Sequence, residues 1–78
     1  MEEIRVSQTL DVRGFNCPIP VIRTRKALAG MQSGDVLEVV SSDPGSRKDM
    51  KVLVERLGHE MIDTSESGSQ ISYYIRKK

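Results

Sequence analysis

The sequence predicts an α+β fold, a two-layer α/β sandwich of order βαβαββ with two helices on one face of a four-stranded mixed sheet. Segments 18–29 and 47–57 repeat apolar residues at helical spacing. The segments around them are β-branched or alternate apolar with polar residues. Alternation in the last segment leaves one face of the sheet in water, so both helices are expected on the other face.

The first strand is expected at residues 4–10. Its apolar residues fall on one face with period two, interrupted by Gln8, and they are Ile4, Val6 and Leu10. A turn is expected at residues 13–14. The segment DVLEVV at 35–40 is β-branched and almost entirely apolar, as in a central strand that has a neighbour on each side.

Each predicted helix has a buried face and a stop signal. The inward residues of the first helix are Val21, Thr24 and Leu28, with Met31 able to continue the face and Gly30 or Gly34 able to end the helix. The second helix is expected to start with Ser46 as its N-cap and to end at Gly58 in a left-handed conformation. Its inward residues are Met50, Leu53, Val54 and Leu57.

The C-terminal residues predict an antiparallel hairpin. Segments 59–66 and 70–78 flank the turn-prone Ser-Gly-Ser at 67–69. In the last strand, Ile71, Tyr73 and Ile75 are expected to face the helices, while Ser72, Tyr74 and Arg76 face water.

The size and the cysteine count limit what the chain can be. Its 78 residues suit one small domain, expected over 1–78, that is stabilised by packing alone. One cysteine cannot form an internal disulfide, and one cysteine with one histidine cannot supply a four-ligand zinc site. The acidic N-terminus is unlike a secretory signal, and no apolar run suits a membrane span. We therefore expect a soluble cytoplasmic protein with a reduced thiol.

Cys17 is the candidate catalytic residue. A residue before proline prefers an extended conformation, so Cys17 is predicted as a helix N-cap, with Pro18 at the first and Pro20 at the third helical position. The positive end of a helix favours thiolate over thiol. Residues 12–34 contain no Asp or Glu, so this segment is positively charged. Its cations are Arg13, Arg23, Arg25 and Lys26.

The function of Cys17 has two interpretations. A single cysteine is more often a small core residue, but the flanking prolines favour an exposed junction where packing does not explain it. The chain has no resolving cysteine for a dithiol cycle and no histidine–carboxylate set for acyl transfer, and His59 suits capping or solvation. A lone thiol suits accepting and releasing sulfane sulfur as a persulfide.

The segment LDVRGFNCPIPVIRTRKAL, with LEVVSSDPGS and LGHEMI, resembles the small sulfur-carrier family that has TusA, SirA-like and YedF-like members. The resemblance covers essentially the whole chain. It implies the βαβαββ sandwich and a sulfurtransferase that acts as a persulfide carrier. The donor would be a cysteine desulfurase or a rhodanese-like protein. The acceptor would be another protein, such as a DsrE-like relay in tRNA thiolation or a component of another sulfur pathway.

The resemblance also assigns individual residues. The sulfur-carrying cysteine falls on Cys17, and the supporting motif positions fall on Asp11, Gly14, Pro18 and Pro20. The candidate partner-binding residues are Arg13 and Lys26, which match basic positions of the family, and Arg23, which belongs to the same positive segment. Asp43 and Pro44 match an acidic-proline loop. No metal and no cofactor beyond the carried persulfide are implied. Many members have a proline and an aromatic residue early in the second helix, where this chain has RKDMKVLVERLG.

Two other functions stand beside the carrier hypothesis. A regulatory or RNA-binding module, with Cys17 chemically unused, would draw on the basic first helix and the IRKK tail. The aromatic platform of single-strand binders is missing except for Tyr74, so direct nucleic-acid binding is not expected, nor is membrane binding. A structural adaptor would bind its partner equally well with Cys17 alkylated.

Overall fold

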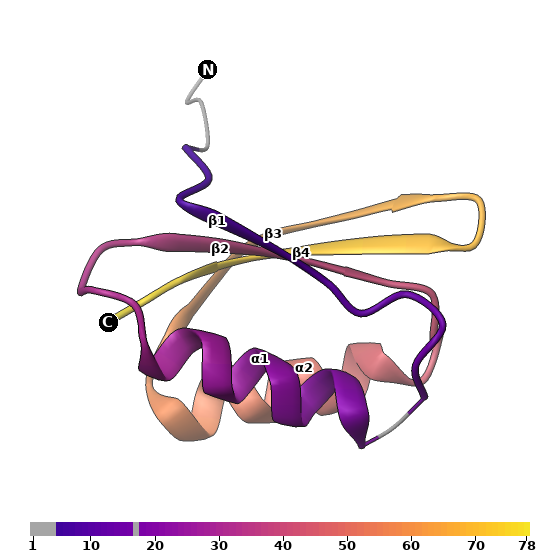
Figure 1. Cartoon of the computed structure of the whole chain (residues 1–78), viewed down its shortest axis with the longest axis horizontal. Coiled ribbons are helices and arrows are strands. Elements are labelled where there is room, and N and C mark those ends of the chain that lie inside the picture. The colour runs from indigo at the N-terminus through magenta and orange to yellow at the C-terminus, as the bar shows by residue number, and fades with distance from the viewer. Residues whose placement is uncertain (1–4, 17) are drawn as a thin grey trace.

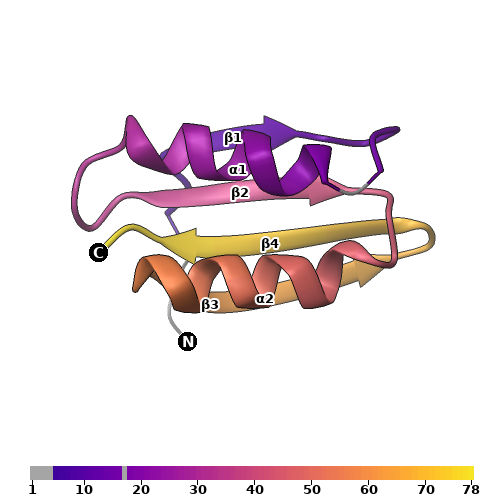
Figure 2. The same cartoon turned by 90° about the horizontal axis from the view of Figure 1, so that it is seen from below.

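The computed structural model describes residues 5–16 and 18–78. Along the chain lie β1 (Gln8–Asp11), α1 (Ile19–Ala29), β2 (Val36–Ser41), α2 (Ser46–Leu57), β3 (Glu60–Ser67) and β4 (Gln70–Arg76). The helices lie side by side on one face of the sheet, with α1 over β1 and β2 and α2 over β3 and β4 (Figures 1 and 2). The predicted two-layer βαβαββ sandwich is confirmed. No helix within the described ranges is long and apolar enough to cross a membrane.

The sheet is mixed and has the strand order β1-β2-β4-β3. β1 pairs with β2 in parallel, with Gln8 opposite Leu37 and Asp11 opposite Val40. β4 pairs antiparallel with both β2 and β3. The strand predicted to be central, β2, does have a neighbour on each side. Because β1 and β2 are parallel, the loops that follow them leave the same edge of the sheet.

The core lies between the sheet and the two helices, as the periodicity predicted for most positions. Its buried apolar residues are Val12, Leu28, Leu37, Val39, Met50, Leu53, Val54, Ile71, Tyr73 and Ile75. The alternation of β4 is confirmed for its inward residues, but Ser72 is only 8% exposed although it faces away from the helices. Ser72 is paired with Val40 on one side and Ser65 on the other, so neighbouring strands cover its small side chain.

The first strand is shorter than predicted. β1 begins at Gln8, and Val6 is 40% exposed, whereas Ile4 lies outside the described residues. Among the described strands, β1 pairs with β2 alone, and β2 begins at Val36. Ser7 meets that first residue by donating its backbone N–H to the Val36 carbonyl oxygen at 2.8 Å. Arg5 and Val6 therefore lie beyond the first residue of β2 and are not part of the strand.

Helix α1 begins one residue later than predicted. Pro18 is its N-cap, with φ −98° and ψ 11°, and Pro20 is its second residue instead of its third. The Ile19 N–H donates to the Asn16 carbonyl oxygen at 3.0 Å. Pro18 thus lies just before the helix and not within it. The prediction that Cys17 is the N-cap falls on a residue outside the described ranges, while the cap position belongs to Pro18.

Helix α2 ends as predicted but starts and packs differently. Gly58 has φ 76° and closes the helix in the left-handed conformation. Gly45, not Ser46, is the N-cap. The Ser46 hydroxyl instead donates to the Asp43 carbonyl oxygen and shares a 2.6 Å hydrogen bond with the buried hydroxyl of Tyr73. Leu57 in the last turn is 40% exposed, so its predicted place in the core was wrong.

Candidate functional site

The turn after β1 is held by one acidic side chain. The Asp11 carboxylate accepts hydrogen bonds from the Arg13 backbone N–H at 3.0 Å and from Nε and Nη2 of the Arg13 guanidinium, both at 2.9 Å. These bonds, the side-chain ones first, lower the pKa of Asp11 to about 2, although the carboxylate is exposed to solvent. The same contact raises the pKa of Arg13. Asp11 therefore acts as an anchor of the turn, and the Arg13 guanidinium is already paired.

The next residue of the turn joins two loops. Gly14 has φ 84°, a backbone conformation that residues other than glycine rarely adopt. Its N–H donates to the hydroxyl oxygen of Ser42 at 2.9 Å. The loop between β1 and α1 is thereby tied to the loop between β2 and α2, at the same end of the molecule (Figure 1). Ser42 was not predicted from the sequence, although parallel β1 and β2 would bring these loops together.

The loop after β2 is ordered by its own hydrogen bonds. The Asp43 carboxylate accepts the Gly45 N–H at 3.0 Å, and the Asp43 N–H donates to the Ser41 hydroxyl at 3.1 Å. Because Ser42 precedes this turn, the Asp43–Pro44 segment lies close to the Asp11–Gly14 turn. The structure thus brings together two segments that the resemblance singled out separately.

The two motif prolines have different surroundings. Pro18 is exposed at the start of α1, whereas Pro20 is almost completely buried. The Pro20 carbonyl oxygen accepts a 2.7 Å hydrogen bond from the buried hydroxyl of Thr24. Cys17, the predicted catalytic residue, lies outside the described residues. The structure does describe the residues before it, from Asp11 to Asn16, and those after it, from Pro18 onward.

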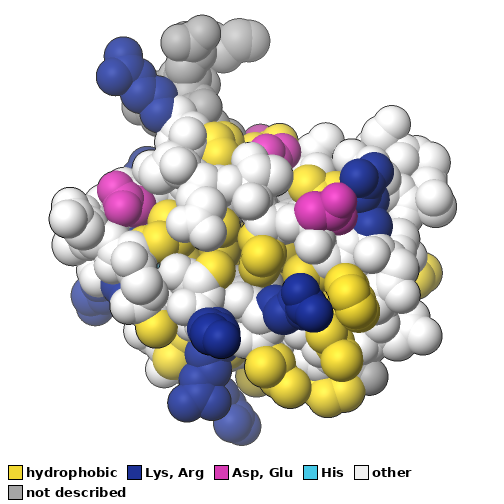
Figure 3. All heavy atoms as spheres, viewed as in Figure 1, with side chains coloured by type: hydrophobic (Ala, Val, Ile, Leu, Met, Phe, Trp, Pro, Cys, Tyr) yellow, Lys and Arg dark blue, Asp and Glu magenta, His cyan; other side chains and the backbone are white. Residues whose placement is uncertain are grey.

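The solvent side of α1 carries both apolar and basic side chains. Ile19 is 40% exposed and Ile22 is 59% exposed, and Phe15, in the loop before the helix, is 37% exposed. The Arg23 guanidinium carbon lies 4.4 Å from the centre of the Phe15 ring, and Lys26 is exposed one turn further on. Figure 3 shows hydrophobic side chains gathered with blue basic ones on this side of the molecule. The sequence indicated Arg23 and Lys26 as candidates, but the exposed apolar residues were missed.

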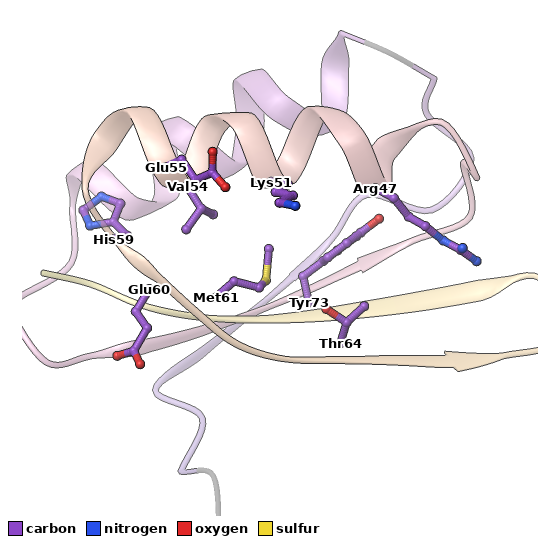
Figure 4. A pocket seen from close by; sticks show the side chains of 9 residues that line it. All are labelled: Arg47, Lys51, Val54, Glu55, His59, Glu60, Met61, Thr64 and Tyr73. Carbon is purple, nitrogen blue, oxygen red and sulfur yellow. The ribbon is translucent and has the colours of Figure 1, made fainter.

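Two hollows lie beside α2. One, of about 320 Å³, opens between the helices, and its lining includes Pro18, Val21, Val52 and Leu53. The other, of about 480 Å³, opens between α2 and β3 (Figure 4). His59 at its end accepts the Lys78 N–H at Nδ1, and burial together with nearby Lys77 lowers the pKa of this histidine. Within the described ranges, no three potential ligand side chains gather as they would around a metal ion.

Two cations of the C-terminal tail and the tyrosine that suggested RNA binding have partners within the chain. Lys77 donates from Nζ to the Leu28 carbonyl oxygen near the end of α1 at 2.6 Å, and Arg76 pairs with Glu60 at 3.0 Å. The Tyr74 hydroxyl donates to a Glu38 carboxylate oxygen at 3.0 Å, and this bond is the largest of the causes that raise the pKa of Tyr74. The open face of the sheet is therefore not a basic stacking surface for RNA.

Comparison with known proteins identifies the family. The model of the family described as Sulfurtransferase TusA matches residues 8–77. The sulfur carrier protein TusA of Allochromatium vinosum is 41% identical over 70 residues, which are 90% of this chain and 92% of that protein. A putative sulfur carrier protein of Thermotoga maritima is 40% identical over an alignment of 79 positions, which covers 100% of this chain and 100% of that protein. The crystal structure of a SirA-like protein from Desulfitobacterium hafniense matches with a TM-score of 0.79 at 32% identity, covering 88% of this chain and 95% of that one. The chain belongs to the TusA family of sulfurtransferases.

Proposed function

We propose that this protein is a sulfur carrier that accepts sulfane sulfur on Cys17 from one protein and passes it to another. The observation that carries the proposal is that the only thiol of a TusA-family chain lies in the CPIP segment, between the Asp11–Gly14 turn and α1. The relatives named above as sulfur carriers support the general role. A cysteine desulfurase or rhodanese-like donor, and an acceptor such as a DsrE-like relay in tRNA thiolation, are the specific partners we propose.

The transfer requires thiol chemistry alone. The Cys17 thiolate attacks the terminal sulfur of a persulfide on the donor, a new S–S bond forms, and the donor cysteine leaves as a thiolate. A thiolate on the acceptor then attacks the terminal sulfur of the Cys17 persulfide in the same way. The sulfane sulfur keeps its oxidation state in each step, so neither an oxidant nor a reductant is consumed. No cofactor other than the carried persulfide takes part.

The described residues support this chemistry from both sides of position 17. On one side, the Asp11–Arg13 contact and the Gly14–Ser42 hydrogen bond hold the preceding turn. On the other side, Pro18 restricts the backbone and α1 begins at Ile19. The free N–H groups of a helix start favour negative charge nearby, and a thiolate is the reactive form of cysteine. Restricting the loop before reaction reduces the ordering cost at the moment of transfer.

The proposal is tested by loading the carrier with sulfur. The protein is incubated with a purified cysteine desulfurase, L-cysteine and pyridoxal phosphate, and its intact mass is measured. We expect a gain of one sulfur atom that dithiothreitol removes and that Cys17→Ser abolishes. Because Cys17 is the only thiol, the mass alone locates the adduct. A wild-type protein that stays unmodified with desulfurases and rhodanese-like donors alike would overturn the carrier function.

A further inference from the structure

We propose that the solvent side of α1 is a docking face for a protein partner whose matching surface is an apolar hollow rimmed by carboxylates. The docking face consists of Phe15, from the loop before α1, and of Ile19, Ile22, Arg23 and Lys26 on the helix. The inference rests on the proposed carrier function, because the partner is taken to be the cysteine desulfurase that loads Cys17 with sulfur. It adds the chemistry by which that partner is recognised.

The spacing of these residues separates them from the core. Ile19, Ile22, Arg23 and Lys26 follow one another at i, i+3, i+4 and i+7, so they share one side of α1. The buried residues of the helix are Pro20, Thr24 and Leu28, which share another side. The two isoleucines therefore do not contribute their exposed surface to the fold. An apolar group that remains in water beside polar residues is typical of an interaction site.

The charge of the face indicates the charge of the partner. Neither Arg23 nor Lys26 forms an ion pair with another described residue. Residues 12–34 contain no Asp or Glu that could neutralise them locally. A complementary surface must therefore carry carboxylates around its apolar centre. A second copy of this chain would present the same cations, so the charge does not favour self-association through this face.

Part of the face is ordered before binding. The Arg23 guanidinium lies over the Phe15 ring at 4.4 Å, and such a contact restrains both side chains. Phe15 itself follows the turn fixed by Gly14 and Ser42, and its N–H donates to the Val12 carbonyl oxygen at 3.3 Å. A surface that is already restrained loses less conformational entropy on binding. Phe15 and Ile22 are thus suited to act as anchors of an interface.

The apolar content of the face favours a protein over RNA. Isoleucine side chains cannot stack on bases as aromatic rings do, and the face has a single aromatic residue whose ring is already covered by Arg23. Exposed aliphatic side chains gain most from an apolar protein hollow that removes them from water. The described part of the chain offers no comparable reason for aliphatic residues at Ile19 and Ile22.

The test compares two exposed apolar residues on different helices. Ile22→Ala removes an anchor of the docking face, and Leu57→Ala is the matched control, because Leu57 is 40% exposed on α2 and outside the face. Sulfur loading of Cys17 by the cysteine desulfurase is measured against carrier concentration. We expect Ile22→Ala to raise KM about tenfold, equal to about 1.4 kcal/mol, and Leu57→Ala to leave KM unchanged. Alkylation of Cys17 by iodoacetamide and the thermal midpoint should match wild type in both variants.

A second pair of variants tests the charge. Lys26→Glu should raise KM at low salt by at least as much as Ile22→Ala, and the increase should shrink at high salt. Lys51→Glu, the same change at an exposed lysine of α2, should leave KM unaltered. Equal effects of both lysine variants would mean that only net charge matters and would overturn the carboxylate-rimmed partner surface.

The outcomes separate the docking face from the carrier function. If wild type is loaded and Ile22→Ala loads like Leu57→Ala, the docking face is wrong and the carrier function stands. If no donor loads wild type, both fall together. The RNA alternative is tested with a fluorescent single-stranded oligonucleotide. Binding that Lys26→Glu weakens while sulfur loading is unchanged would assign the face to RNA and overturn the proposal.

Discussion

At the scale of single residues, the contact between Asp11 and Arg13 gives a prediction about pH. Hydrogen bonds from Arg13 lower the pKa of Asp11 from 3.8 to about 2. A depressed carboxyl pKa stabilises the turn above the unfolded value, and that contribution is lost as the pH falls through the folded value. The turn should therefore stay intact at pH 4 and lose this anchor between about pH 4 and pH 2.

This prediction is checked by following the Asp11 carboxyl carbon by NMR during an acid titration. Wild type should titrate near pH 2, and Arg13→Gln should move the midpoint back toward 3.8. The hydrogen bond from the backbone N–H of residue 13 is unaffected by the substitution, so part of the depression should remain. A wild-type midpoint close to 3.8 would show that the exposed contact is too short-lived to matter.

At the scale of elements, the two prolines at the start of α1 differ in burial, although both were assigned to the same motif from the sequence. Pro20 is buried against the core and Pro18 is exposed. Replacing Pro20 by alanine removes two buried carbon atoms, so we expect a loss of about 1–2 kcal/mol in the free energy of unfolding. Pro18→Ala should cost less than about 1 kcal/mol, mainly through the greater freedom of the unfolded chain.

Urea unfolding of the two variants measures this difference in the free energy of unfolding. The loading assay measures the effect of each variant on sulfur loading. Pro18→Ala should slow sulfur loading, because the backbone next to Cys17 in the chain becomes less restricted. Pro20→Ala should instead have its main effect on the free energy of unfolding. If both variants lose the same free energy of unfolding, the division between a surface proline and a core proline is wrong.

At the scale of the whole molecule, structural features that depend on a single element were predicted from the sequence. Features that depend on contacts between two elements were not. The strict periodicities of α2 and β4 predicted most of the core, because one segment contains the whole pattern. The start of β1 was misjudged, since it depends on where β2 begins. The prediction that Ser46 is the N-cap of α2 was wrong, because the Ser46 hydroxyl is hydrogen-bonded to Tyr73 from the last strand. On α1, apolar residues lie on both sides, so periodicity alone could not separate the core from Ile19 and Ile22.

Ser42 is the clearest case of a residue that only the assembled fold explains, and it gives the last prediction. Its hydroxyl oxygen accepts the Gly14 N–H at 2.9 Å and joins the loops that follow the two parallel strands. Ser42→Ala removes this link. Gly14 lies at the surface, where water can replace the bond, so the free energy of unfolding should fall by no more than about 1 kcal/mol. The loop before Cys17 should become less ordered, and sulfur loading should slow several-fold.

Hydrogen exchange at the Gly14 amide distinguishes this positioning role from a general loss of stability. Exchange should be faster in Ser42→Ala, while amides of β2 and β4 keep their wild-type rates. Ser42→Thr retains a hydroxyl at the same position, so it should restore both the slow exchange and the loading rate. Loading that remains slow in Ser42→Thr despite restored protection of Gly14 would show that the link does not position the sulfur-carrying loop.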